Sequence, residues 1–242
     1  MKSPRLRLFA EGFRYGLPVM LGYAPVSFAF AVAMVAKGLP WPVVLAISLT
    51  NFTSAGQAAG ADLMLQSAPL PEIAVTVFVI NIRYLLMSLS LSQKFTHLSL
   101  GKRLLAANGV TDEIFFLAMR KPGELSGWLF AGLAAGPYLG WVGGTLVGGL
   151  AGAILPASLA SALGIALYAM FIAIVTPAAR ESRSVLRVVL VAVGLSCLFR
   201  YIPFLHTHVA SGWALILCAV IASALGALRD PSADVAEGGE AT

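Results

Sequence analysis

Long runs of apolar residues, separated by short polar or charged loops, make up most of the chain. An α-helix needs about 20 mostly apolar residues to cross the ~30 Å hydrocarbon core of a bilayer. Eight candidate segments lie at about 16–36, 43–66, 71–92, 104–119, 128–155, 158–178, 186–203 and 211–228. The pattern predicts an all-α integral membrane protein, a polytopic helical bundle with about 6–8 hydrophobic segments.

Composition supports lipid as the solvent of this chain. Of its 242 residues 59% are hydrophobic and 11% are charged, and the mean hydropathy is +0.87. A soluble domain carries roughly 25% charged residues, because its surface needs charge. We expect a cytoplasmic arm at 1–15, one transmembrane domain at 16–228 and a disordered cytoplasmic tail at 229–242. Because further spans follow the first segment, we interpret it as an uncleaved helix and not a signal peptide.

Two segments are interrupted by polar residues and glycine. Segment 43–66 contains the stretch Asn-Phe-Thr-Ser-Ala-Gly-Gln-Ala-Ala-Gly-Ala-Asp at 51–62, and segment 104–119 is interrupted between Asn108 and Glu113. Irregular backbone at membrane depth survives only where protein encloses it or where it lines a cavity. We therefore predict broken or re-entrant helices at 43–66 and 104–119.

The distribution of positive charge bears on the topology. Basic residues cluster in the N-terminal arm, at Lys94/Lys102/Arg103, at Arg120/Lys121 and at Arg180/Arg183/Arg187. If both interrupted segments turn back, every cluster falls on the cytoplasmic side, as the positive-inside rule requires. That arrangement has six full spans with a cytoplasmic N-terminus and C-terminus. Seven or eight spans remain the alternatives.

Several function classes find no support in the sequence. The net charge of +5 comes from loops and the N-terminal arm, with no basic stripe interleaved with aromatics, so we expect no nucleic-acid partner. Cys197 and Cys218 lie inside apolar segments, and the histidines show no ligand spacing, so we expect no metal and no cofactor. Hydrolase and nucleotide-binding motifs are absent, and we predict that the chain is not an enzyme.

Glycine recurs every fourth residue in segment 128–155. The positions are Gly132, Gly136, Gly140, Gly144, Gly148 and Gly152. On a helix this spacing forms a stripe of small residues, which lets two backbones approach closely in lipid. We interpret the stripe as a tight crossing of two helices within the chain; a partner-binding or sliding face is the alternative.

Ionisable residues inside apolar segments are the first candidates for function, because burying them in a membrane is costly. Arg83 lies near the middle of segment 71–92 and needs a carboxylate partner or an anionic ligand. Asp62, Asp112 and Glu113 are the acids available, and we assign all three to proton coupling. On a helix, Asp112 and Glu113 point about 100° apart, so one can pair with Arg83 while the other faces a cavity. A structural ion pair is the alternative role of Arg83.

Neutral polar side chains near the first interruption complete the predicted binding site. We assign Thr53, Ser54, Gln57 and Asn81, together with Arg83, to substrate binding. A broken helix offers a free N-terminal end to a carboxylate and a free carbonyl end to an ammonium group, which suits a zwitterion. Ordinary hydrogen bonding between helices is the alternative.

Four short blocks follow one another in a fixed order between about residues 10 and 120. They are Gly16-Leu17-Pro18 with Gly22-Tyr23-Ala24-Pro25 and Phe28-Ala29-Phe30, the stretch from Phe52 to Gln57, the block from Asn81-Ile82-Arg83 to Ser92, and Thr111-Asp112-Glu113. Together they resemble the AzlC family, the large subunits of branched-chain amino acid exporters. Beyond residue 120 only the hydrophobic pattern agrees.

The resemblance implies a secondary transporter that exports branched-chain amino acids and is coupled to protons. It also implies a small hydrophobic partner subunit of the AzlD type and a location in the bacterial inner membrane. Two departures from the family pattern bear on substrate and coupling. Tyr84 stands where many members have histidine, and Thr53, Ser54, Gly56 and Ala58 alter the glutamine block.

Two other function classes are compatible with the residues alone. One is a passive channel or facilitator for another small polar solute, which would show no coupling to a proton gradient. The other is a non-transporting membrane scaffold that uses the glycine stripe. Loss of transport on changing Arg83 separates the transporter from the scaffold.

Overall fold

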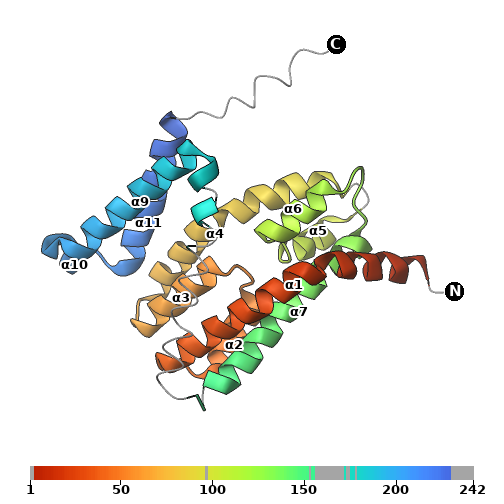
Figure 1. Cartoon of the computed structure of the whole chain (residues 1–242), viewed down its shortest axis with the longest axis horizontal. Coiled ribbons are helices and arrows are strands. Elements are labelled where there is room, and N and C mark those ends of the chain that lie inside the picture. The colour runs from red at the N-terminus through yellow and green to blue at the C-terminus, as the bar shows by residue number, and fades with distance from the viewer. Residues whose placement is uncertain are drawn as a thin grey trace, which may run out of the picture.

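The computed structural model describes residues 3–95, 98–152, 154–155, 172, 175–177 and 179–229, and the described chain is helical without strands (Figure 1). Its helices are α1 (Pro4–Ala36), α2 (Trp41–Thr50), α3 (Ala55–Leu65), α4 (Leu70–Gln93), α5 (Leu100–Ala107), α6 (Asp112–Arg120), α7 (Gly127–Gly152), α9 (Arg183–Tyr201), α10 (Pro203–His208) and α11 (Ser211–Arg229). The predicted all-α class is confirmed. Most of segment 158–178 and the tail after Arg229 lie outside the described residues.

The longest helices, α1 and α7, lie side by side and run in the same direction (Figure 1). Contacts advance together along both helices, from Gly132 against Phe9 to Gly148 against Phe28. α1 continues through its two internal prolines without interruption. The pair therefore forms a rigid wall against which the shorter helices pack.

The glycine stripe makes this close approach possible. All six of its glycines have atoms of α1 within 4 Å of the position that a Cβ would take. A Cβ on Gly140 would lie 2.6 Å from the carbonyl oxygen of Met20, and one on Gly16 of α1 would lie 2.6 Å from that of Leu133. Backbone packs directly on backbone here. The stripe is covered within the chain, so it offers no face to another subunit.

Helices α2 and α3 form the first hairpin. The helix breaks at residues 51–54, between the C-terminus of α2 and the N-terminus of α3. The last turn of α3 returns to the end of α1, where the Lys37 ammonium lies 2.8 Å from the Asp62 carboxylate. The hairpin thus enters and leaves at one end of the bundle, as the re-entrant interpretation of segment 43–66 requires.

Helices α5 and α6 form a second hairpin, which enters from the opposite end. The Lys94 ammonium, at the end of α4, donates to the carbonyl oxygen of Met119 at 3.1 Å, and the Leu125 amide donates to the Lys94 carbonyl oxygen at 2.9 Å. Segment 104–119 therefore also turns back, with its break at residues 108–111. Lys121 pairs with Glu11 at 2.7 Å, which places the start of α1 at this same end.

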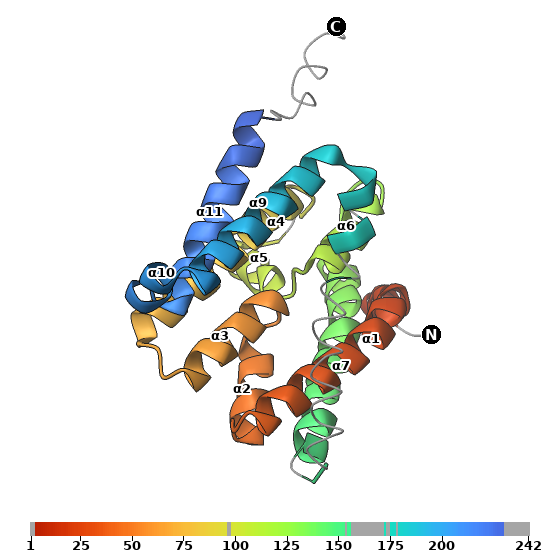
Figure 2. The ribbon, with the colours of Figure 1, turned by 60° about the vertical axis from the view of Figure 1, so that its left-hand side comes forward.

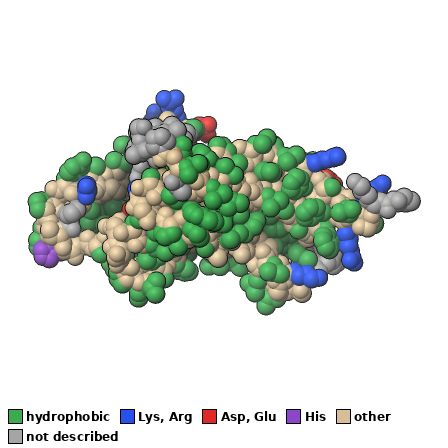
Figure 3. Space-filling view, turned by 90° about the horizontal axis from the view of Figure 1, so that it is seen from below, with side chains coloured by type: hydrophobic (Ala, Val, Ile, Leu, Met, Phe, Trp, Pro, Cys, Tyr) green, Lys and Arg blue, Asp and Glu red, His purple; other side chains and the backbone are tan. Residues whose placement is uncertain are grey.

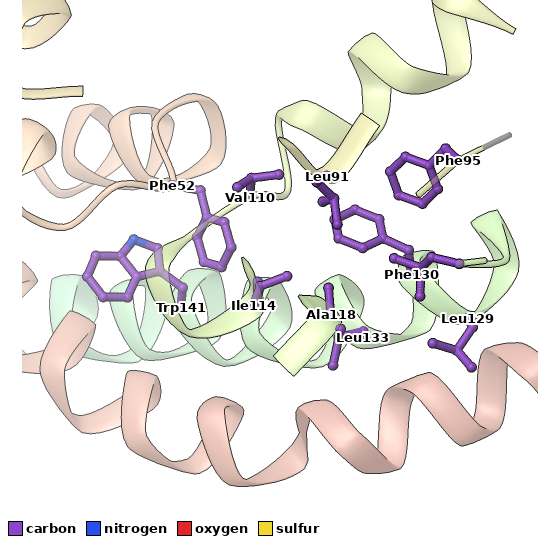
Figure 4. Packing of buried hydrophobic residues seen from close by; sticks show 11 residues of the cluster. Phe52, Leu91, Phe95, Val110, Ile114, Ala118, Leu129, Phe130, Leu133 and Trp141 are labelled. Atoms are coloured by element: carbon purple, nitrogen blue, oxygen red, sulfur yellow. The ribbon is translucent and has the colours of Figure 1, made fainter. Parts of the chain in front are cut away.

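The tips of the two hairpins meet in the core of the molecule (Figure 4). Phe52, from the first break, belongs to the same buried cluster as Val110 and Ile114 of the second hairpin and Trp141 of α7. Ile114 is fully buried, with 0% of its surface exposed. Apolar contact between the tips holds the two breaks at the same depth.

Helices α9, α10 and α11 form a unit that attaches to the rest of the chain through α11, which packs on α4 and α3 (Figure 2). The Gly212 amide at the start of α11 donates to the buried carboxylate of Glu72 at 2.9 Å. Ser211 donates to Gln66 at 2.8 Å. Both contacts satisfy polar groups where α11 begins.

Apolar side chains are spread over the face seen in Figure 3, among uncharged groups, and the few Lys and Arg side chains lie mainly near its margins. Among the described residues, four helices are long and apolar enough to cross a membrane: α1, α4, α9 and α11. α7 has 26 residues, about 39 Å at 1.5 Å per residue, and packs along α1, so it is long enough to cross as well. Its many glycines lower its hydropathy.

Gly140→Ala tests the helix crossing. The added Cβ would push the backbones of α1 and α7 apart, and overpacking of this kind costs about 1–3 kcal/mol. We expect the unfolding midpoint in detergent to fall by roughly 3–10 °C.

Gly143→Ala is the matched control, because nothing lies within 4 Å of its Cβ position on the same helix. Alanine is the better helix former, so this midpoint should stay or rise. Equal midpoints for both variants would contradict the close crossing.

Candidate functional site

A cavity of about 650 Å³ lies where the two hairpin tips meet α1, α4 and α7. Its lining comprises Val19, Gly22, Tyr23, Val26, Phe52, Thr53, Ser54, Ala55, Arg83, Tyr84, Thr111, Asp112, Glu113, Trp141 and Val175. Apart from Val175, these residues come from the two breaks, from the first turns of α3 and α6, and from the long helices α1, α4 and α7. The volume lies in the range of sites for small molecules.

Two helix N-termini open into this cavity. Helix α3 begins after Ser54, whose φ of 48° lies in the left-handed region and whose side chain does not cap the helix. Helix α6 begins after Thr111, whose hydroxyl accepts from the Ile114 amide at 3.4 Å. The first amides of a helix have no partner within it and carry the positive end of its dipole. The α3 terminus in particular presents free N–H groups to an anion.

Arg83 and Asp112 form an ion pair at the cavity wall. The Arg83 Nη2 lies 2.9 Å from Asp112 Oδ2, and their side chains are 50% and 40% exposed. Because both residues line the cavity, this exposed surface is available to a ligand. Tyr84 joins the pair: its hydroxyl accepts from Arg83 at 3.0 Å and donates to Asp112 at 3.3 Å.

Glu113 takes a different partner from its neighbour Asp112. The hydroxyl of Tyr23 on α1 donates to a carboxylate oxygen of Glu113 and lies 2.9 Å from the Thr111 hydroxyl oxygen. The two adjacent acids therefore diverge, one toward α4 and the other toward α1. Both remain at the cavity, since each belongs to its lining.

An aromatic wall forms the apolar side of the cavity. Tyr23 and Trp141 meet edge to face with ring centroids 5.4 Å apart, and Tyr23 and Phe52 do so at 5.7 Å. Phe52 also packs against Tyr138 at 5.5 Å. Edge-to-face packing of this kind fixes ring positions and leaves apolar surface toward the cavity.

Gln57 lies behind this wall and not in the cavity lining. It is fully buried, and its amide donates to Ser48 at 2.5 Å while its carbonyl oxygen accepts from Trp141 at 2.9 Å. Ser48 in turn shares a hydrogen bond of 2.8 Å with Thr145 of α7. The network satisfies buried polar groups and ties the first hairpin to α7. The structure thus gives Gln57 protein partners where substrate contact was expected.

The remaining predicted residues divide between the cavity and the rest of the chain. Thr53 and Ser54 line the cavity. Asn81 packs against Gly56 near the start of α3, outside the lining, and its Oδ1 is buried with no partner among the described residues. Asp62 lies at the far end of α3, paired with Lys37, and does not meet the other two acids.

Four contributors to the site were not among the predicted site residues. Tyr23, Tyr84, Thr111 and Trp141 line the cavity or hold its charged residues in place. Tyr23, Tyr84 and Thr111 lie within blocks already singled out in the sequence, so position in a block was the available signal. Trp141 lies on α7, outside every such block. Within the described ranges, no three His, Cys, Asp or Glu residues gather as a metal site.

Membrane proteins from other organisms are similar to this chain in sequence. An uncharacterized membrane protein of Archaeoglobus fulgidus is 34% identical over 142 residues, which cover 57% of this chain and 60% of the relative. The inner membrane protein YgaZ of Escherichia coli is 28% identical over 151 residues, covering 60% of this chain and 61% of the relative. The matches thus span about three-fifths of these relatives' length. No solved structure matches.

A family model, described as AzlC protein, matches residues 18–155. The matched range runs from the middle of α1 to the end of α7 and contains both hairpins. Apart from Val175, every residue that lines the central cavity falls within it. This chain is a membrane protein of the AzlC family.

Proposed function

We propose that the protein is a secondary transporter that exports branched-chain amino acids, coupled to protons, together with a small AzlD-like subunit. The observation that carries the proposal is the central cavity. It combines the free N-terminus of α3, the Arg83–Asp112 ion pair and an aromatic wall. These are the three chemistries that a zwitterion with an aliphatic side chain requires.

Each part of an amino acid has a counterpart in the cavity. The carboxylate would bind at the start of α3, beside Ser54, and to the guanidinium of Arg83. The ammonium group would bind to Glu113, whose carboxylate Tyr23 holds in place. The aliphatic side chain would lie against the apolar wall that includes Phe52.

Proton coupling would follow from competition between substrate and proton for an acid of the cavity. Without substrate, the Asp112 carboxylate neutralises the Arg83 guanidinium. The substrate ammonium group needs the negative charge of Glu113, and a proton bound to that carboxylate would remove the charge. Substrate and proton would therefore occupy the site in turn, as the exchange of an outgoing amino acid for an incoming proton requires. Tyr84, bonded to both members of the pair, would hold Asp112 near the arginine.

Topology and location follow the positive-inside rule. Glu11, Lys94 and Lys121 lie at one end of the bundle, and we assign this end to the cytoplasm because it gathers the basic clusters. Both termini would then be cytoplasmic. The name of the Escherichia coli relative places that protein in an inner membrane, which supports the same location here.

Amino acid efflux tests the transporter directly. Cells that express the chain with an AzlD-like subunit would be preloaded with Val, Leu or Ile through dipeptides. We expect Arg83→Gln and Asp112→Asn to lower the efflux rate at least tenfold, and collapse of the proton gradient to abolish the wild-type rate. Asp62→Asn makes the same change in an ion pair outside the cavity and should retain most efflux.

Three outcomes would each contradict a part of the proposed transport function. Unchanged efflux of every amino acid from a well-expressed complex would reject the exporter. Efflux that ignores the proton gradient would indicate a passive facilitator. Normal efflux from Arg83→Gln would show that the ion pair takes no part in transport.

The double variant Arg83→Gln/Asp112→Asn separates transport from folding. Removing one partner leaves the other charge uncompensated, which costs about 3–5 kcal/mol for a buried pair and less here because the pair faces a cavity. Removing both charges should restore the yield of folded protein, measured by size-exclusion chromatography, while efflux stays absent. Restored efflux would mean that the pair serves structure only.

Gln57→Leu tests the structural role of the glutamine. The change leaves the buried Trp141 N–H without a partner, at a cost of about 1–3 kcal/mol. Ser48 loses one hydrogen bond and keeps the other, to Thr145. We expect a lower unfolding midpoint and less folded protein, with an unchanged substrate concentration for half-maximal efflux. A severalfold increase in that concentration at unchanged stability would show instead that Gln57 contacts substrate.

A further inference from the structure

The first turns of α1 extend beyond the hydrocarbon core. The helix has 33 residues, so it is about 50 Å long, against a core of about 30 Å. Its first turns carry Arg5, Arg7, Glu11 and Arg14, and Arg5 lies 6.0 Å from the ring of Trp128 at the start of α7. Charged residues beside interfacial aromatics place this part of α1 among the lipid headgroups.

A shallow groove of about 430 Å³ runs along this part of α1, lined by Leu6, Arg7, Ala10, Glu11, Arg14 and Tyr15. Arg7 and Arg14 are two turns apart and share one face of the helix. Among the described residues, no carboxylate pairs with either arginine. Glu11 pairs with Lys121 instead, at 2.7 Å. The groove therefore presents two uncompensated positive charges.

Lys121 is a third positively charged residue near the groove. The hydrogen bond that Lys121 donates to Glu11 raises the pKa of the lysine, because the carboxylate favours its charged form. The Lys121 ammonium also lies 4.1 Å from the centre of the Tyr15 ring. These contacts neutralise Glu11, so the acid does not cancel the charge of Arg7 and Arg14.

A second hollow, of about 400 Å³, continues from the groove toward the middle of the membrane, between α1 and α6. Tyr15 lines both hollows. Pro18, Val19, Phe116 and Leu117 give the second hollow a mostly apolar wall, and Asp112 and Glu113 complete its lining at the N-terminus of α6. Two basic side chains at headgroup level thus lie next to a mostly apolar surface hollow, with Tyr15 between them.

We infer that an anionic phospholipid binds at this place, with its phosphate between Arg7 and Arg14 and one acyl chain in the hollow between α1 and α6. A basic pocket joined to an apolar groove matches a molecule with an anionic head and a hydrocarbon tail. A zwitterionic lipid offers less charge to the arginines, and a free phosphate leaves the apolar hollow unused. The phosphate position lies outside the amino acid cavity, whereas the hollow adjoins it, because Val19, Asp112 and Glu113 line both.

Native mass spectrometry of the purified chain tests the site, with phosphatidylglycerol and phosphatidylcholine of the same acyl length supplied together. We expect at least fivefold preferential retention of phosphatidylglycerol, lost in the double variant Arg7→Gln/Arg14→Gln. Lys102→Gln/Arg103→Gln on α5 removes the same net charge and should keep the preference. Excess glycerol phosphate, the headgroup without acyl chains, should not displace the lipid.

Three results would overturn the inference. Equal retention of the two lipids would show that the arginines do not select charge. Equal loss in both double variants would show that net charge alone attracts the lipid. Displacement by glycerol phosphate would show a site for free phosphate. The readout is lipid retention alone, so failure of the amino acid exporter proposal leaves this test unaffected.

Discussion

Hydrocarbon offers no hydrogen bonds, so each backbone amide at membrane depth needs a partner from protein or cavity water, and lacking one costs several kcal/mol. This chain nevertheless breaks two helices in its core, at residues 51–54 and 108–111. The breaks are tolerated because their tips pack on each other and against α1 and α7. The close, glycine-lined crossing of those two helices supplies the wall that encloses them.

The same constraint creates the electrostatics of the site. Each break leaves a helix N-terminus inside the molecule, and both open into one cavity. Positive helix ends favour nearby acids, which accounts for Asp112 and Glu113 in the first turn of α6. Arg83 then needs one of those acids when no ligand is present. A bound anion can replace Asp112 as the partner of Arg83, so the ion pair can open when a ligand binds.

Polar residues in the broken segments serve two different purposes. Those at the tip, such as Thr53 and Ser54, face the cavity. Gln57 lies one turn farther along α3, and its hydrogen bonds hold the hairpin on α7. Asp62 lies in the last turn of the same helix and ties the base of the hairpin to the end of α1 through Lys37. A hairpin that enters the membrane and returns needs polar contacts at its base and along its second helix as well as at its tip.

The sequence by itself determined the membrane class, the two breaks, the small-residue stripe and the acids that could meet Arg83. Each of these follows from composition or from periodicity along one helix, which local residue order records. Only the tertiary structure decided that the stripe faces α1. It also decided that Asp112 forms an ion pair with Arg83, whereas Glu113 accepts a hydrogen bond from Tyr23. Gln57 and Asp62 were placed outside the cavity by the same packing. Periodicity shows which residues share a face, but the partner of that face comes from segments distant in the chain. Packing of those segments, and not residue type, sets which polar group meets the cavity.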